Sequence, residues 1–138
     1  MIRHGPRLFL LLVLTLCMPS CGGGERTLLS ISISPAAADA QNFTNGMVPF
    51  TATGAFSQDP KTAPLTSGDV TWCIGSSSGT CAGFVVSGAV VDSNGLARCN
   101  AGFNGIVTVL AGKPSGVPVP ADTGFPVKIY GMAALTCP

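Results

Sequence analysis

The chain has few charged or proton-transferring side chains. Its 138 residues include a single His, His4, and charged residues make up only 9% of the total. Seven basic residues against six acidic ones give a net charge of +1, so there is no broad field to attract nucleic acid. The 18 Gly and 11 Pro residues argue against a coiled coil or helical bundle, because both residue types disfavour helix.

The N-terminus has no apolar run long enough to span a bilayer. Leu8–Leu16 has nine residues, whereas a membrane-spanning helix needs about 20. Basic residues before this run and small residues after it are typical of a secretion signal. The signal ends in Ser20-Cys21 followed by glycines, which resembles the lipobox of bacterial lipoproteins. In those proteins the Cys is diacylated and becomes the mature N-terminus; an ordinary signal peptide with Cys21 as an incidental thiol is the alternative.

The lipobox resemblance implies three segments. Residues 1–20 are a signal peptide, residues 21–27 are the lipidated Cys21 and a flexible tether, and residues 28–138 are the domain. We therefore expect an exported protein that its N-terminal lipid anchors to a membrane, since each buried methylene contributes about 0.8 kcal/mol. In a bacterium with two membranes, Gly22 after the Cys is compatible with the outer membrane, facing the periplasm or the exterior.

The mature chain shows the two-residue period of β-strands, not a helical period. Apolar and hydroxyl residues alternate in the segment before Pro35, and Asp92-Ser-Asn-Gly95 predicts a hairpin turn. The expected strands are 29–34, 48–56, 70–74, 96–103, 106–111 and 127–135, with short apolar pieces at 82–86 and 89–91. Loops are expected at 57–68 and 112–126. This pattern predicts an all-β fold, an immunoglobulin-like antiparallel sandwich of seven or eight short strands, with Ile31, Phe50, Val70 and Trp72 in the core.

Five short segments occur in an order that resembles the bacterial immunoglobulin-like group-2 domain. They are LSISISP (29–35), FTATGAFS (50–57), VTW (70–72), VDSNGLA (91–97) and GIVTVLAG (105–112). The resemblance implies a β-sandwich that serves as a spacer or adhesion module on cell envelopes, and it does not imply an enzyme. The chain differs from the family in carrying Cys73 after the VTW strand and four Cys within the domain.

Four domain cysteines are expected to form two disulfides in an exported protein. We favour Cys73–Cys81, which would close a Ser/Gly loop, and Cys99–Cys137, which an immunoglobulin-like strand order would place at one pole. A four-Cys metal site is the alternative, but sequential separations of 8, 18 and 38 residues lack the close pairs of such sites. We expect no metal and no cofactor.

The catalytic patterns in the chain are incomplete. Ser77 lies in a formal G-x-S-x-G, yet removal of the signal removes the only His that could accept its proton. The five Asp residues lie beside turn-forming residues, where Asp commonly bonds to backbone amides. Asp92-Ser-Asn-Gly95 lacks the further ligands of a calcium loop. These features predict a protein that is not an enzyme.

Two kinds of function fit this sequence. The first is a lipid-anchored structural or adhesive module of the cell envelope, whose protein or glycan partner the sequence does not identify. The second is a small carbohydrate- or protein-binding module that uses loop 112–126 and exposed aromatic residues. Its candidate ligand contacts are Phe103, Phe125 and Tyr130.

Overall fold

The structure, a computed structural model, describes residues 25–81, 88–114 and 127–138. Several predictions lie outside these residues: the signal peptide 1–20, Cys21, the apolar piece 82–86, Phe125 and most of the loop predicted at 112–126. Within the described ranges the regular elements are strands and two 3₁₀ turns, and no helix there is long and apolar enough to cross a bilayer.

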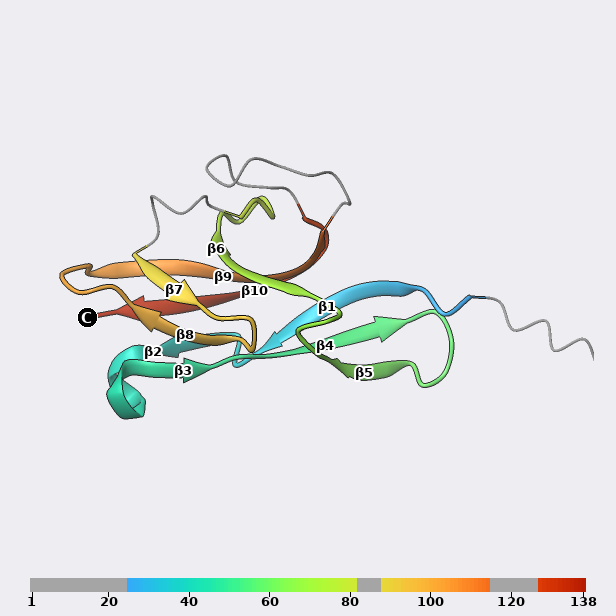
Figure 1. The fold of residues 1–138 in the computed structure, drawn as a ribbon, viewed down its shortest axis with the longest axis horizontal. Coiled ribbons are helices and arrows are strands. Elements are labelled where there is room, and N and C mark those ends of the chain that lie inside the picture. Colours follow the sequence, from blue (N-terminus) through green and yellow to red (C-terminus); the bar gives the residue numbers. More distant parts are fainter. Residues whose placement is uncertain (1–24, 82–87, 115–126) are drawn as a thin grey trace, which may run out of the picture.

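The described chain forms an all-β sandwich whose long axis runs from the start of β1 to the end of β10 (Figure 1). The strands are β1 (Leu28–Ser34), β2 (Ala37–Asp39), β3 (Met47–Pro49), β4 (Thr51–Phe56), β5 (Thr62–Leu65), β6 (Thr71–Gly75), β7 (Ala89–Val91), β8 (Leu96–Cys99), β9 (Gly105–Pro114) and β10 (Val127–Cys137). The 3₁₀ turns η1 (Ala40–Asn42) and η2 (Thr44–Gly46) connect β2 to β3.

One layer consists of two short sheets that share a nearly continuous strand. The sheets have the orders β1-β4-β5 and β3-β8-β7. Only Phe50 separates β3 from β4, and its backbone N–H donates to the carbonyl oxygen of Gly95 at 2.9 Å. The segment 47–56 therefore pairs with β8 along its first part and with β1 and β5 along its second.

The other layer is a four-stranded sheet in the order β2-β10-β9-β6. β10 and β9 pair antiparallel over their whole length, and β6 pairs antiparallel with the second half of β9. β2 pairs with β10 in parallel, so the N-terminal part of the chain belongs to both layers: β1 to the first and β2 to the second. The antiparallel arrangement expected from the sequence holds for every strand pair described except this one.

The core lies between the two layers and is built from the alternating inward residues of their strands. All four predicted core residues, Ile31, Phe50, Val70 and Trp72, are buried. They pack in one cluster with Val109 and Leu135 and with several small residues of the facing strands. Phe50 is among the largest fully buried side chains, because it lies where β3 passes into β4 and the Asp92–Gly95 turn folds over it.

The structure differs from the predicted strands in several places. The loop predicted at 57–68 contains β5, and the Ala-rich connection after Pro35 contains β2. The strand predicted at 48–56 is interrupted at Phe50, and the one predicted at 96–103 ends at Cys99, because a turn at Asn100–Phe103 reverses the chain. β9 and β10 each extend beyond the predicted ends, to Pro114 and Cys137.

The predicted hairpin at Asp92-Ser-Asn-Gly95 is confirmed by the β7–β8 pair. Asp92 Oδ1 accepts the backbone N–H groups of Asn94 at 2.8 Å and Leu96 at 2.9 Å. Gly95 adopts φ +82°, and a Cβ there would lie 2.4 Å from the carbonyl oxygen of Phe50. Only glycine fits this position, which fixes the turn against the core.

Candidate functional surfaces

The start of the domain is fastened to the hairpin that joins β4 to β5. The Arg26 guanidinium lies 3.6 Å from the centroid of the Phe56 ring and donates to the carbonyl oxygen of Pro60 at 2.6 Å. The backbone N–H and hydroxyl of Thr27 both reach Ser57 Oγ, at 3.0 and 2.9 Å. Within the described residues, Arg26 already contacts the fold, although it belongs to the segment predicted as tether.

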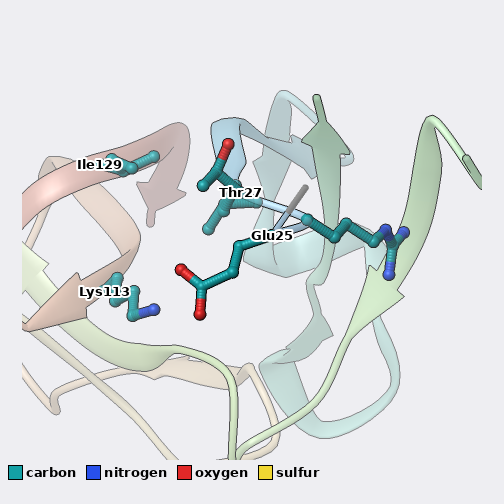
Figure 2. A pocket seen from close by; sticks show the side chains of 6 residues that line it. Glu25, Thr27, Lys113 and Ile129 are labelled. Carbon is teal, nitrogen blue, oxygen red and sulfur yellow. The ribbon is translucent and has the colours of Figure 1, made fainter. Parts of the chain in front are cut away.

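A groove opens where the chain enters the fold. This entry groove is a cavity of about 560 Å³, and its lining residues come from three parts of the chain: Glu25, Arg26, Thr27, Leu28, Lys113 and Ile129. Figure 2 shows the Glu25 carboxylate reaching into the groove on the side of Lys113, while Ile129 lies farther along the same wall. The ends of β1, β9 and β10 thus bring charges of both signs and apolar side chains together at one place.

A charged turn lies close to the same groove. The Asp69 carboxylate accepts the backbone N–H of Thr66 at 2.8 Å and its hydroxyl at 2.7 Å. These two hydrogen bonds lower the pKa of Asp69 below its usual value, and the nearby Lys113 ammonium lowers that pKa further. Asp69 consequently remains negatively charged at neutral pH.

A second, smaller packed region covers the outer face of the four-stranded sheet. After β6 the chain folds back, and the Cys73–Cys81 disulfide closes this loop with an S–S distance of 2.00 Å. Leu110 and Cys81 are fully buried beneath it although neither belongs to the main core cluster. Strand alternation alone did not indicate this region, because the covering loop contacts the face opposite the core.

Tyr130, a predicted ligand contact, lies in this covered region and is half-buried. A Cβ on Gly79 would lie 2.3 Å from the Tyr130 ring, so the loop backbone lies directly against that ring. Ser77 lies in the same loop, where the backbone N–H of Ser76 donates to the carbonyl oxygen of Thr80 at 2.9 Å. Gly75 forms a β-bridge with Cys81, so no helix follows Ser77 there. The loop lacks the strand-to-helix geometry of a nucleophile elbow.

Phe103, the other predicted aromatic contact in the described chain, is half-buried and packs against the edge of the core. A Cβ on Gly88 would lie 2.4 Å from its ring. The outer side of Phe103 lines a cleft of about 480 Å³ together with Ile106, whose side chain is 71% exposed. Phe103 and Tyr130 thus each have one side of the ring covered by a glycine, Gly88 and Gly79 respectively.

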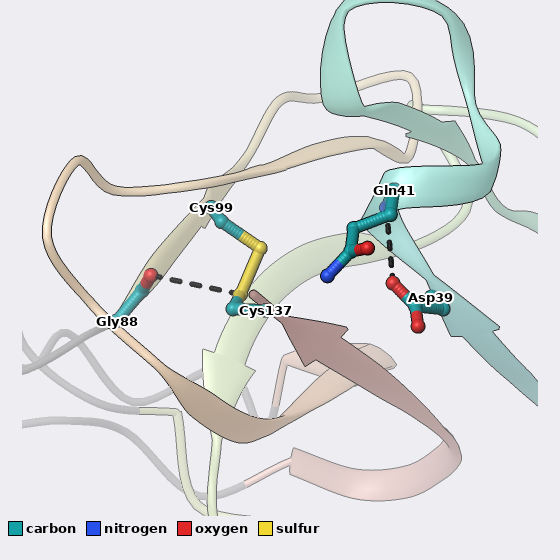
Figure 3. The surroundings of a disulfide bond; sticks show 5 residues. All are labelled: Asp39, Gln41, Gly88, Cys99 and Cys137. Atoms are coloured by element: carbon teal, nitrogen blue, oxygen red, sulfur yellow. Dashed lines mark hydrogen bonds between the residues drawn. A yellow bond between two sulfur atoms is a disulfide. The ribbon is translucent and has the colours of Figure 1, made fainter.

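The second disulfide joins the two layers. Cys99 at the end of β8 and Cys137 at the end of β10 have an S–S distance of 1.96 Å and a Cα–Cα distance of 5.7 Å (Figure 3). The carbonyl oxygen of Gly88 lies 4.0 Å from Cys137 Sγ. On the neighbouring β2, Asp39 Oδ1 accepts the backbone N–H of Gln41 at 3.0 Å and caps the turn η1. Both bridges are the pairings favoured from the sequence.

An outward-facing row crosses the sheet β3-β8-β7. Met47 and Val90 pair with Arg98 from opposite sides, so that two apolar side chains flank one cation. Met47 is 41% and Val90 is 40% exposed. An apolar pair around a guanidinium is a combination that is common in protein interfaces.

The described residues contain no group of three or more His, Cys, Asp or Glu side chains placed to hold a metal ion. The four cysteines of the domain all form disulfides, so none of them can bind a metal ion as a thiolate. Comparison with models of known protein families and with curated proteins finds no match to this chain.

Proposed function

We propose that this protein is a lipid-anchored immunoglobulin-like module of a bacterial cell envelope, with a structural or adhesive role and no enzymatic activity. The observation that carries the proposal is the pair of disulfides within an all-β sandwich, at 2.00 and 1.96 Å. Disulfides form and persist in oxidising compartments outside the cytosol. The lipobox-like Ser20-Cys21 supplies a means of retention there.

The strand order supports a group-2 immunoglobulin-like assignment as part of this proposal. In immunoglobulin-like sandwiches Greek-key connections pair strands that are distant in sequence. Here β3 pairs with β8 and β4 with β1, and β9 lies between β6 and β10. The VTW and D-x-x-G-L motifs both fall at positions where the fold uses them: Trp72 is buried, and Gly95 closes the hairpin.

The test of the proposal is mass spectrometry of the protein extracted from envelope membranes with detergent. We expect the mature N-terminus at Cys21 with acyl chains attached, and no peptides from residues 1–20. The variant Cys21→Ser should lack the acyl mass, whereas replacement of the other leader-region cysteine, Cys17→Ser, should retain it. Recovery of the intact leader on cytoplasmic protein would contradict the proposal.

The row Met47–Arg98–Val90 favours adhesion to a protein over a purely spacer role. Truncating an arginine at the centre of an interface typically costs more binding free energy than truncating a side chain at its rim. If the row binds a partner, Arg98→Glu should abolish chemical cross-links that the native protein forms in envelope extracts, while Ala101→Glu, in an exposed turn outside the row, should retain them. If both variants cross-link equally, the row does not bind a partner and only the spacer role is left.

A further inference from the structure

The chain enters the fold close to the residue that the proposed function assigns to the lipid. Arg26 is fastened to Phe56 and Pro60, and only residues 22–25 separate it from Cys21. An extended chain advances at most about 3.4 Å per residue, so Arg26 lies no more than about 17 Å from Cys21. An acylated Cys21 therefore holds the entry groove close to the headgroup layer.

The basic side chains of the described chain gather around this entry. Lys113 and Arg26 line the groove together, and Lys128 directly precedes Ile129, which lines the same groove. Lys61 donates to the carbonyl oxygen of Ser57 at 2.7 Å, and Ser57 is the residue that binds Thr27. Four of the five basic residues described thus lie near the entry, and the fifth, Arg98, is on β8 beside the Cys99–Cys137 bridge.

The carboxylates do not cancel this concentration of cations. Within the part of the chain that the structure describes, Glu25, Asp59 and Asp69 lie near the four entry cations, which leaves a balance of +1 there. The remaining described carboxylates, Asp39 and Asp92, lie elsewhere on the domain with Arg98, which leaves a balance of −1 there. Among the described side chains, the net positive part is thus the part where the lipid anchor would attach.

An exposed apolar side chain projects from the same region. The pairing of β1 with β4 shifts register between Leu28 and Ser30, and this bulge leaves Leu29 without a cross-strand partner position. Its side chain is 60% exposed, although β1 is otherwise half-buried in the usual alternation. An exposed leucine at the start of β1, three residues after Arg26, is suited to the boundary between headgroups and acyl chains.

We propose that the entry face, formed by Arg26, Leu29, Lys61, Lys113 and Lys128, rests on the anionic headgroup layer of the membrane that carries the anchor. This inference depends on the acylation of Cys21 in the proposed function. The cations bind lipid phosphates, and Leu29 inserts between headgroups. The domain then has a fixed orientation, with the Arg98 side directed away from the bilayer and open to partners.

Lysine acetylation read by mass spectrometry tests the orientation on the lipidated protein. The protein is placed in vesicles of phosphatidylethanolamine with about one-third phosphatidylglycerol, and in uncharged detergent micelles. Each cation near an anionic surface favours the membrane-bound position over the free one by about fivefold. Labelling of Lys61, Lys113 and Lys128 should therefore fall about fivefold in the vesicles. The variant Arg98→Lys supplies an amine elsewhere on the domain as the matched control, and its labelling should not change.

Charge variants separate membrane contact from other sources of protection. The double variant Lys113→Gln, Lys128→Gln should restore labelling of Lys61, whereas Arg98→Gln should not. Inorganic phosphate without vesicles should protect none of the lysines, and protection by it alone would overturn the inference in favour of a phosphate site. Equal labelling at all positions on a protein with acyl mass at Cys21 would refute the orientation while leaving the anchor intact; a preparation without acyl mass would refute both.

Discussion

The disulfide Cys99–Cys137 should contribute more to stability than Cys73–Cys81. The two bridges close loops of 38 and 8 residues. In the chain-entropy model a bridge restricts the unfolded chain more as its loop lengthens, which gives about 4 kcal/mol for the longer loop and about 2.5 kcal/mol for the shorter. Replacing Cys99 and Cys137 by Ala should therefore lower the free energy of unfolding by about 1.5 kcal/mol more than replacing Cys73 and Cys81 by Ala.

The two double variants are well matched for this comparison. Each removes one fully buried cysteine, Cys137 or Cys81, so both lose a similar packing contribution. Urea unfolding at neutral pH, followed by the fluorescence of the buried Trp72, measures both free energies. At about 4 °C per kcal/mol, the longer bridge should also account for about 15 °C of the melting temperature. A loss for the Cys99/Cys137 variant equal to or below that of the Cys73/Cys81 variant would refute the loop-length reasoning.

Three further predictions concern single side chains. Gly95→Ala places a Cβ 2.4 Å from a backbone oxygen at φ +82°, whereas Gly102→Ala places one in open space at φ +78°. Urea unfolding should therefore show a free energy of unfolding lowered by more than about 2 kcal/mol for Gly95→Ala and by about 1 kcal/mol for Gly102→Ala. Leu110→Ala leaves a cavity under the Cys73–Cys81 loop and should lower the free energy of unfolding by about 2–5 kcal/mol, measured by thermal unfolding. Ile106→Ala, at an exposed position, should change it by no more than about 0.5 kcal/mol. Similar losses for both variants would contradict the buried role of Leu110. Hydrogen bonds from Thr66 lower the pKa of Asp69, so the contribution of this carboxylate to stability is present above the unfolded pKa and is lost as pH falls through the folded pKa. Asp69→Asn should remove this part of the acid destabilisation. An NMR titration that gives Asp69 an ordinary pKa would refute the prediction.

The parts of the fold that the sequence predicted are those that depend on local chemistry. The alternation of Ile31 and Ile33 with serines marks β1, and Asp92 with Gly95 marks the hairpin, because the turn needs a side-chain acceptor and a positive φ within four residues. Trp72 and Phe50 were predictable as core residues, since each falls on the apolar side of an alternating sequence, although Phe50 itself lies between β3 and β4.

The parts that the sequence missed depend on distant partners. β2 has only three residues, and it exists because β10 offers a parallel edge almost one hundred positions later in the chain. β5 contains Pro64, which normally argues against a strand, but β5 lies at a sheet edge where one missing N–H is tolerated. Leu110 is buried because a loop returns over the outer face, and no periodicity in β9 could indicate that loop.

The Arg26 fastening has a mechanical consequence. The start of β1 and the end of β10 lie at opposite ends of the long axis (Figure 1). Tension applied between them would run along β1 and load its hydrogen bonds with β4 in shear, so that they share the force and do not open one by one like a zipper. The covalent Cys99–Cys137 link would limit how far the chain could extend after β1 yields. We therefore expect the domain to stay folded under tension until its β1–β4 hydrogen bonds break together, a behaviour that would suit the proposed adhesive role.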